Sequence, residues 1–254
     1  MTENIDSYPL WQQRTAMLIG GEGLDKLKKS HVLVVGLGGV GAYAAELICR
    51  AGVGKMTIVD GDVVEASNRN RQLPATVYSE GKSKAEIMHA RLAAINPEAE
   101  IISLHKFIHD EETDELLKPD YSYVVDAIDS LSSKTYLIIK TIQRGLPLIS
   151  SMGAGGKWDP STVRVADISK TFNCRLAKAV RRRLRMLNVN PKFKTVFSPE
   201  DVDDDAIIPF ENPETGNRRS IVGTISYMPA IFGCFCASAV IRELTKIQIQ
   251  DEAK

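Results

Sequence analysis

The stretch HVLVVGLGGVG, residues 31–41, decides the fold of this chain. Four of its first five residues, Val32 to Val35, are β-branched or apolar, and the run predicts a short buried strand. The rest has the spacing Gly-x-Gly-x-x-Gly, with Gly36, Gly38 and Gly41 in place and Gly39 as a fourth glycine. Small residues at helical spacing follow. A glycine turn between a strand and a helix lets phosphate approach the backbone at the positive end of the helix dipole. The stretch therefore predicts a nucleotide-binding turn.

A second strand, KMTIVD (55–60), ends in Asp60, which stands 19 residues after Gly41. In nucleotide-binding sheets an acid at about this place accepts hydrogen bonds from ribose hydroxyls. A glycine pattern alone could be a structural turn. The order strand, glycine loop, helix, strand and acid favours a bound nucleotide.

Strands and helices continue to alternate along the chain. We expect strands in EIISLHK, YVVDAI and LPLIS, and helices over 83–95 and 133–144. Alternation of this kind implies right-handed crossovers and a parallel sheet covered on both faces. The fold class predicted is α/β, a Rossmann-like, doubly wound and mainly parallel sheet with helices on both faces. After Gly156 the segment TVRVADI alternates, and we expect antiparallel strands to extend the sheet there.

The chain divides at about residue 156. We expect a nucleotide-binding region over 1–156 and an extension over 157–254, together forming one continuous domain. The extension should contain a basic helix (170–187), a loop rich in Pro, Asp and Asn (190–220), and an apolar helix. Residues 221–241 carry no charge and are long enough for a membrane span. Their glycines, serines and Pro229 favour a buried helix instead, so no membrane association is expected.

The overall composition narrows the function classes. The 254 residues include 32 basic and 32 acidic side chains, which excludes a wholly basic nucleic-acid coat protein but allows local patches. The amino-terminal segment has no apolar core of the kind found in signal peptides. Few cysteines suggest a reducing, cytoplasmic setting. Their spacing gives no zinc motif, and we expect buried small hydrophobic side chains at Cys49, Cys174, Cys234 and Cys236.

The polar segment after Asp60 indicates which nucleotide binds. It contains SNRNRQ (67–72), and an enzyme that handles a triphosphate needs such cations, whereas a nicotinamide oxidoreductase does not. Lys84 adds a charge at the start of the next helix. Asp129 follows the fourth strand, where open α/β sheets bind ligands, and can hold phosphate-bound Mg²⁺. The alternatives are solvated surface charges for Arg71 and Lys84, and a helix cap for Asp129.

The motifs GLGGVG, VDGD, SNRNRQ, GKSKA and DAIDS resemble those of the adenylating enzymes related to ubiquitin activation. That family includes the enzymes that adenylate the sulfur carriers of molybdopterin and thiamine synthesis, and the resemblance covers about the first 150 residues. It implies ATP and Mg²⁺, and leaves open whether a monovalent cation binds. The ATP-binding residues that it implies are Gly36, Gly38, Gly39, Gly41, Asp60, Asp62, Asn68, Arg71 and Lys84.

The same resemblance implies catalytic roles for Arg14, Arg71, Lys84 and Asp129, with Asp129 holding the magnesium. Arg14, in WQQR, matches an arginine that reaches the ATP site of the neighbouring subunit in this family. A homodimer is therefore expected, with Arg14 acting in trans. A mobile surface side chain is the alternative for Arg14.

The second half of the chain distinguishes between branches of the family. Members that act on sulfur carriers generally have paired CxxC zinc motifs, which are missing here, so no structural zinc is expected. Instead, residues 170–187 carry seven positive charges and no acid. A run of charges is usually a solvated face. In a neutral protein, unopposed positive charges on one helix favour contact with a phosphate backbone.

With ISYMPAIFG and VIREL further on, this segment resembles the tRNA threonylcarbamoyladenosine dehydratases, a branch of the same family, over nearly the whole chain. The resemblance implies ATP-dependent cyclisation of the modified adenosine through a carboxyl-adenylate. Ring closure is intramolecular and needs no enzyme nucleophile. The tRNA-binding residues implied are Lys170, Arg175, Lys178, Arg181, Arg182 and Arg185.

Three alternative functions stay open from the sequence. The first is adenylation of the C-terminus of a ubiquitin-like sulfur carrier, the second is a nicotinamide oxidoreductase, and the third is a non-catalytic nucleotide-binding scaffold. A sulfur-carrier-like or cysteine-desulfurase-type protein partner is left open as well, as is the role of Cys174.

Overall fold

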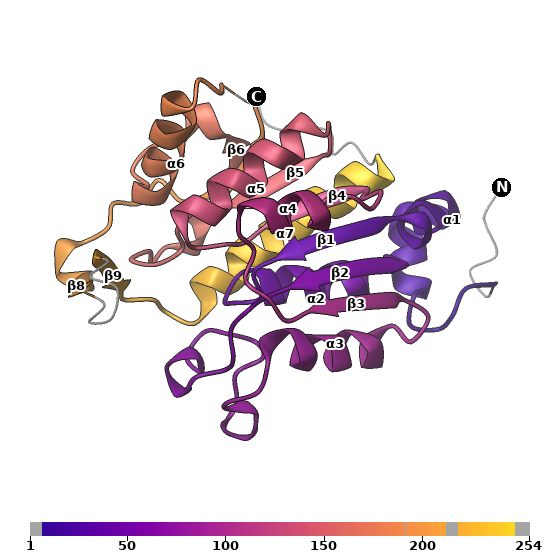
Figure 1. Ribbon diagram of the computed structural model, residues 1–254. Coiled ribbons are helices and arrows are strands. Elements are labelled where there is room, and N and C mark those ends of the chain that lie inside the picture. The colour runs from indigo at the N-terminus through magenta and orange to yellow at the C-terminus, as the bar shows by residue number, and fades with distance from the viewer. Residues whose placement is uncertain (1–6, 191, 212–217, 247–254) are drawn as a thin grey trace.

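The structure is a computed structural model that describes residues 7–190, 192–211 and 218–246. Its centre is a seven-stranded sheet with the order β3-β2-β1-β4-β5-β7-β6 (Figure 1). Within the described ranges every neighbouring pair is parallel except β6 with β7. This confirms the predicted doubly wound sheet with an antiparallel extension. The strands are β1 (His31–Val35), β2 (Lys55–Val59), β3 (Glu100–Leu104), β4 (Tyr123–Asp126), β5 (Leu148–Ser151), β6 (Arg164–Asp167) and β7 (Lys194–Phe197).

Helices cover both faces of the sheet, and each face has its own hydrophobic core. Alternate residues of β1 supply the two cores: Val32 and Val34 point into one, Leu33 and Val35 into the other. A strand that is buried on both faces is expected to be apolar throughout, as HVLVV is. The first face carries α1 (Gln13–Lys29), α2 (Gly41–Arg50), α3 (Lys84–Ile95) and α7 (Tyr227–Thr245), and the second carries α4 (Asp110–Leu116), α5 (Leu131–Gln143) and α6 (Arg175–Met186).

The prediction of a loop over 190–220 is wrong. Strand β7 lies in this segment and pairs with both β5 and β6. Strands β8 (Ile207–Glu211) and β9 (Arg218–Val222) form a separate antiparallel pair. β7 has only four residues, and pairing on both sides stabilises it in a way that a sequence pattern does not reveal.

The apolar segment 221–241 contains most of α7, which is long and apolar enough to cross a membrane by length and composition alone. The expectation of a core helix is confirmed, because Met228, Phe232, Cys236 and Val240 are buried against the sheet. Gly233 allows a close approach to α2, since a Cβ atom there would lie 2.6 Å from the carbonyl oxygen of Val40.

The order of the strands fixes where a ligand can bind. Strand β1 lies between β2 and β4, so the connections leave it in opposite directions. In open α/β sheets the crevice beyond the carboxyl ends of such strands is the ligand site. The glycine loop follows β1 and Asp129 follows β4, so both lie at this edge.

Candidate nucleotide site and basic helix

The glycine loop is packed so tightly that larger residues do not fit. Gly36 has a φ angle of +90°, and a Cβ atom there would lie 2.7 Å from the carbonyl oxygen of Ala127. A Cβ atom at Gly41 would lie 1.8 Å from the carbonyl oxygen of Gly36, and one at Gly39 would lie 2.9 Å from Cβ of Pro229. The loop after β4 and the start of α7 therefore both contact the glycine loop.

Asp60 is bound to the glycine loop through the backbone. Its Oδ2 accepts a hydrogen bond from the amide of Leu37 at 2.5 Å, and its Oδ1 accepts one from the amide of Asp62 at 2.8 Å. Burial raises the pKa of Asp60, although the two amides and the nearby Lys84 partly offset this rise. The carboxylate is thus fixed at the end of β2, where ribose hydroxyls are expected.

Lys84 is a buried cation and not a solvated surface charge. Its Nζ forms an ion pair with Asp62 at 2.8 Å, and its side chain is 5% exposed. Its amide also donates to the carbonyl oxygen of Asp62. The start of α3 and the loop after β2 are joined by these two bonds, which holds a positive charge near Asp60.

Asn68 shapes the loop that carries it. Its Oδ1 accepts a hydrogen bond from the amide of Glu65, and its Nδ2 donates to Oγ of Ser67 at 3.3 Å. The side chain is buried. Both groups of this side-chain amide already have partners within the loop. Its predicted contact with phosphate stays a prediction.

Arg71 lies next to the glycine loop and is held in place. Its Nη1 donates to the carbonyl oxygen of Ser67 at 2.9 Å and to Oδ1 of Asn70 at 2.7 Å. Asn70 in turn donates to the carbonyl oxygen of Thr224 at 3.0 Å. A Cβ atom at Gly39 would lie 3.4 Å from the carbonyl oxygen of Arg71. The SNRNRQ segment therefore lines the glycine loop from the side.

Gln72 is a site residue that the sequence did not identify. Its amide lies beneath the loop, 3.7 Å from where a Cβ atom of Gly38 would be. In the described part of the chain, its Oε1 is one of three buried side-chain polar atoms without a hydrogen-bond partner. A buried acceptor of this kind is costly unless a ligand or water supplies a donor. Its position directly after Arg71 was the available signal.

A fully buried ion pair supports the turn that carries Asp129. Nζ of Lys134 lies 2.6 Å from Oδ2 of Asp126, and Oγ of Ser150 donates to the same oxygen at 2.5 Å. The other carboxylate oxygen of Asp126 accepts from the amide of Ile128. Asp129 itself is exposed at the edge of the crevice. The sequence did not identify this pair, although Lys134 stands at helical spacing from apolar residues of α5.

Arg14 is not brought together with these groups. It is exposed on the first turn of α1. Gln12, just before this helix, lies against Gly52, which follows α2 at the amino edge of the sheet. Figure 1 shows α1 at the far end of β1 from the glycine loop.

In the ranges that the structure describes, no group of three or more His, Cys, Asp or Glu residues could hold a metal ion. Asp129 would act on phosphate-bound Mg²⁺ as a single carboxylate. Three cysteines are buried, as expected, but Cys234 is exposed, which corrects that part of the prediction. Burial raises the pKa of Cys49 to about 11 and that of Cys236 to about 12.

The basic helix α6 packs through Ala177, Val180 and Leu184. Four of the six predicted tRNA-binding residues are exposed on or beside it with the charge outward, namely Lys170, Lys178, Arg182 and Arg185. Arg175 is also exposed but forms an ion pair with Asp204. Arg181 is turned inward and donates to Thr171 and to the carbonyl oxygen of Ile168. Arg181 therefore braces the helix against the preceding turn.

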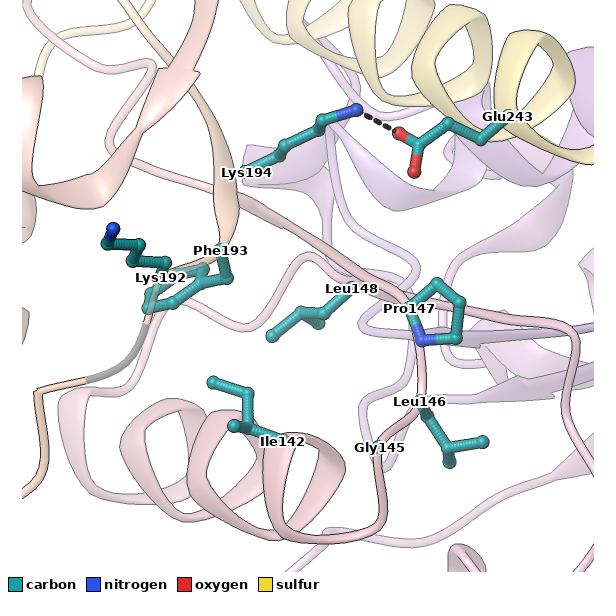
Figure 2. A pocket seen from close by; sticks show the side chains of 9 residues that line it. All are labelled: Ile142, Gly145, Leu146, Pro147, Leu148, Lys192, Phe193, Lys194 and Glu243. Atoms are coloured by element: carbon teal, nitrogen blue, oxygen red, sulfur yellow. Dashed lines mark hydrogen bonds and ion pairs between the residues drawn. The ribbon is translucent and has the colours of Figure 1, made fainter. Parts of the chain in front are cut away.

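A cavity of about 290 Å³ lies elsewhere, at the amino ends of β5 and β7 (Figure 2). Pro147, Lys192 and Phe193 are among its lining residues, and Lys194 forms an ion pair with Glu243 at 2.6 Å on its rim. None of the predicted site residues lines it. It is therefore distinct from the crevice at the carboxyl edge.

A glycine loop at a strand switch point, an acid fixed beside it and buried or braced cations around it define a nucleotide-binding α/β protein of the Rossmann-like class. The chain belongs to the ThiF family, whose model matches residues 12–254. A tRNA threonylcarbamoyladenosine dehydratase from Bacillus subtilis is 39% identical, over 92% of this chain and 94% of that protein.

Solved structures of related proteins resemble the structure of this chain as well. The crystal structure of the Escherichia coli tRNA N6-threonylcarbamoyladenosine dehydratase in complex with ATP superposes with a TM-score of 0.84 at 33% identity. It covers 94% of this chain and 96% of that one. A sulfur carrier protein adenylyltransferase from Thermus thermophilus is 34% identical, but over only 58% of this chain and 53% of that protein.

Proposed function

We propose that this protein is an ATP-dependent enzyme that cyclises N6-threonylcarbamoyladenosine in tRNA by way of a carboxyl-adenylate. The observation that carries the proposal is the pairing of two features in one chain. A nucleotide site of the adenylating family stands at the carboxyl edge of the sheet, and an outward-facing basic helix stands in the C-terminal part of the chain. The dehydratases of B. subtilis and E. coli match both parts, since they match over nearly the whole chain.

The residues present fit ATP. Asp60 supplies a fixed acceptor for ribose hydroxyls. The glycine loop leads into the amino end of α2 and has few side chains that would shield its backbone amides from phosphate. Gln72 has a buried carbonyl oxygen that still needs a donor. Arg71 and Lys84 provide positive charge on the side where the phosphates would lie. Mg²⁺ bound to the phosphates, with Asp129 as its protein carboxylate, would neutralise charge on the leaving pyrophosphate.

The reaction has two steps. A carboxylate oxygen of the threonyl group attacks the α-phosphorus of ATP, and the bond to pyrophosphate breaks. The neighbouring carbamoyl group then attacks the activated carbonyl carbon, loses a proton and closes the ring, while AMP departs with the carboxylate oxygen. The net change is the removal of one water. Arg71 and Lys84 stabilise the charge that develops on the phosphates, which is commonly a large part of catalysis.

Three further parts of the proposal concern partners and place. The enzyme is a homodimer, in which Arg14 of one subunit reaches the ATP site of the other. This is supported by the position of Arg14 away from its own glycine loop. The exposed residues of the basic helix, with Arg175, bind tRNA phosphates. The protein works in the cytoplasm, a setting that its free cysteines favour.

The rival function is adenylation of a sulfur-carrier C-terminus. It is less well supported, because the likeness to a sulfur carrier adenylyltransferase extends over little more than half of the chain. The basic helix gives such an enzyme no evident advantage.

The test is mass analysis of nucleosides from tRNA that carries threonylcarbamoyladenosine, after incubation with the protein and ATP. We expect a product lighter by one water, together with AMP and pyrophosphate in equal amounts. Lys84→Ala should reduce the rate on the order of a hundredfold, since one charge-stabilising contact is typically worth about 3 kcal/mol. Lys29→Ala, on an exposed cation at the end of α1, is the matched control.

If no cyclised nucleoside forms while a ubiquitin-like carrier is adenylated at its C-terminus, the proposal is wrong and the rival is correct. A product that forms at the parental rate in Lys84→Ala would leave the function standing and remove the assigned site.

A further inference from the structure

Trp158 lies between the glycine loop and the basic helix, and nothing above gives it a role. It follows β5, seven residues past the carboxyl end of that strand. The hydroxyl of Tyr227 donates to its carbonyl oxygen at 2.9 Å. Tyr227 begins α7, two residues before Pro229, which contacts the glycine loop. Trp158 is thus connected to the nucleotide site through the first residues of α7, since Tyr227 binds its carbonyl oxygen and Pro229 contacts the glycine loop.

The opposite side of Trp158 is tied to the basic helix. Its neighbour Lys157 is buried, and Nζ of Lys157 donates to the carbonyl oxygens of Asn173 and Glu200. Asn173 stands two residues before the start of α6. Trp158 is therefore linked both to the start of α7, beside the glycine loop, and to the segment just before α6.

The backbone of Trp158 is fixed while its ring is free. The carboxylate of Glu200 accepts hydrogen bonds from the amides of Trp158 and Asp159, at 2.9 to 3.0 Å. The residue is nevertheless 68% exposed. Its ring meets that of Tyr227 edge to face, with centroids 6.5 Å apart, so Tyr227 leaves at least one indole face uncovered. Because the backbone is held in place and one ring face is free, the indole can stack against another planar group.

We propose that Trp158, backed by Tyr227, is the stacking platform for an unpaired base of the tRNA loop that carries the modified adenosine. The inference rests on the proposed function and names how the same site positions its substrate. Proteins that read single-stranded RNA stack splayed bases on aromatic side chains. Here the phosphates would lie on α6 and the base on Trp158, which leaves the threonyl carboxylate directed toward ATP. Trp158 is a positioning residue in this scheme, since its role is to hold the base.

Tryptophan fluorescence tests the stacking directly. The chain has two tryptophans, so Trp11→Phe leaves Trp158 as the only reporter. We expect a stem-loop RNA with threonylcarbamoyladenosine in its loop to quench the emission of this variant. A fully paired RNA of equal length, which can bind α6 but offers no free base, should quench little. In Trp158→Phe the stem-loop should leave the remaining emission almost unchanged.

Kinetics separate positioning from folding. Trp158→Ala should raise KM for the stem-loop about five- to hundredfold, the range given by base–aromatic stacking. The kcat at saturating RNA and KM for ATP should stay near parental values, and Trp158→Phe should recover most of the loss. Tyr78→Ala is the matched control, because Tyr78 is 88% exposed and lies on a different loop.

The outcomes are distinct. Unchanged KM in Trp158→Ala, or equal quenching by paired RNA, overturns the stacking role while cyclisation by the parent protein keeps the proposed function. If the parent forms no cyclised product yet the stem-loop quenches Trp158 selectively, the function is wrong and the base platform stands.

Discussion

Lys134, one of the buried lysines, shows that the site also depends on residues that cannot touch a ligand. Both it and Asp126 have fully buried side chains, 2.6 Å apart. A charge in such a place is tolerated only when it is paired and hydrogen-bonded, and removal of one partner is far more costly than removal of both. Asp126 stands three residues before Asp129 and Lys134 five residues after it, so the pair also fixes the turn that presents this carboxylate.

We predict that Lys134→Ala lowers the free energy of unfolding by about 3 to 5 kcal/mol, because the carboxylate of Asp126 is left buried without its cation. Asp126→Ala should cost a similar amount. The double variant should be more stable than the sum of the two losses predicts. Urea unfolding of the three variants measures this coupling. Strictly additive losses would mean that the pair contributes no mutual stabilisation.

At this scale the sequence singled out residues that are predicted to face the ligand, whereas it missed residues that support them. The glycines, Asp60, Arg71 and Lys84 could be singled out because their residue types at strand ends have a known physical use. Asn68 was assigned to phosphate from the family resemblance, and Arg181 was assigned to tRNA from the charge of its helix and the resemblance. The side chains of both are largely engaged within the protein. The role of Lys134 was missed, because the position of a lysine in the sequence does not show whether its ammonium group is solvated or paired with a carboxylate on another strand.

Among the elements, helix α6 combines one apolar stripe with an unusually charged remainder. Ala177, Val180 and Leu184 anchor it to the sheet through α5 and the strands. Because this stripe alone is buried, the outward cations can be changed without disturbing the core. Substitutions of these cations therefore test the effect of charge without a change in the packing of the core.

We predict that Arg182→Glu combined with Arg185→Glu weakens tRNA binding strongly and leaves ATP binding intact. Each lost phosphate contact should also reduce the slope of log K against log salt concentration by roughly 0.7 to 0.9. Filter binding across salt concentrations measures both. Lys29→Glu, on an exposed position at the end of α1, is the control, because the adjacent Lys28 is engaged in an ion pair with Glu98. A parental slope in the α6 variant would make this helix an ordinary solvated face.

The elements that sequence patterns predicted best are those with a pattern of their own. The alternating strands and helices of residues 31–151 were largely anticipated. Strand β7 was not, because its four residues gain their stability from two neighbouring strands. Helix α1 was missed as well, since Gly20 interrupts it with a φ angle of 70° and three of its residues are glycine.

At the scale of the whole molecule, the most informative feature is that Arg14 lies far from the glycine loop. The two lie at opposite edges of one sheet, so Arg14 has no route to the ATP site of its own subunit. Its neighbours in sequence include three exposed apolar residues, Leu10 just before α1 and Met17 and Leu18 within it. Exposed apolar side chains gathered in this way commonly mark an interface. A two-fold dimer would bury them and carry each Arg14 to its partner.

We predict that Arg14→Ala and Lys84→Ala, each nearly inactive alone, regain activity when mixed. One of the two sites in each heterodimer is then intact, so random exchange in a two-fold dimer should restore roughly a quarter of the parental rate. The rate of cyclised-nucleoside formation measures it. Subunit exchange is verified with differently tagged chains. No recovery after confirmed exchange would place Arg14 outside catalysis or within its own subunit.

The contact between Pro229 and Gly39 has a consequence for the order of synthesis. A ribosome delivers the glycine loop early and α7 late, yet α7 forms part of the core behind that loop and packs against it at Gly39 and Val40. A nascent chain that ends before α7 has all the glycines, Asp60 and Lys84, but one wall of its site is missing. We therefore expect the nucleotide site to be complete only after α7 has been made.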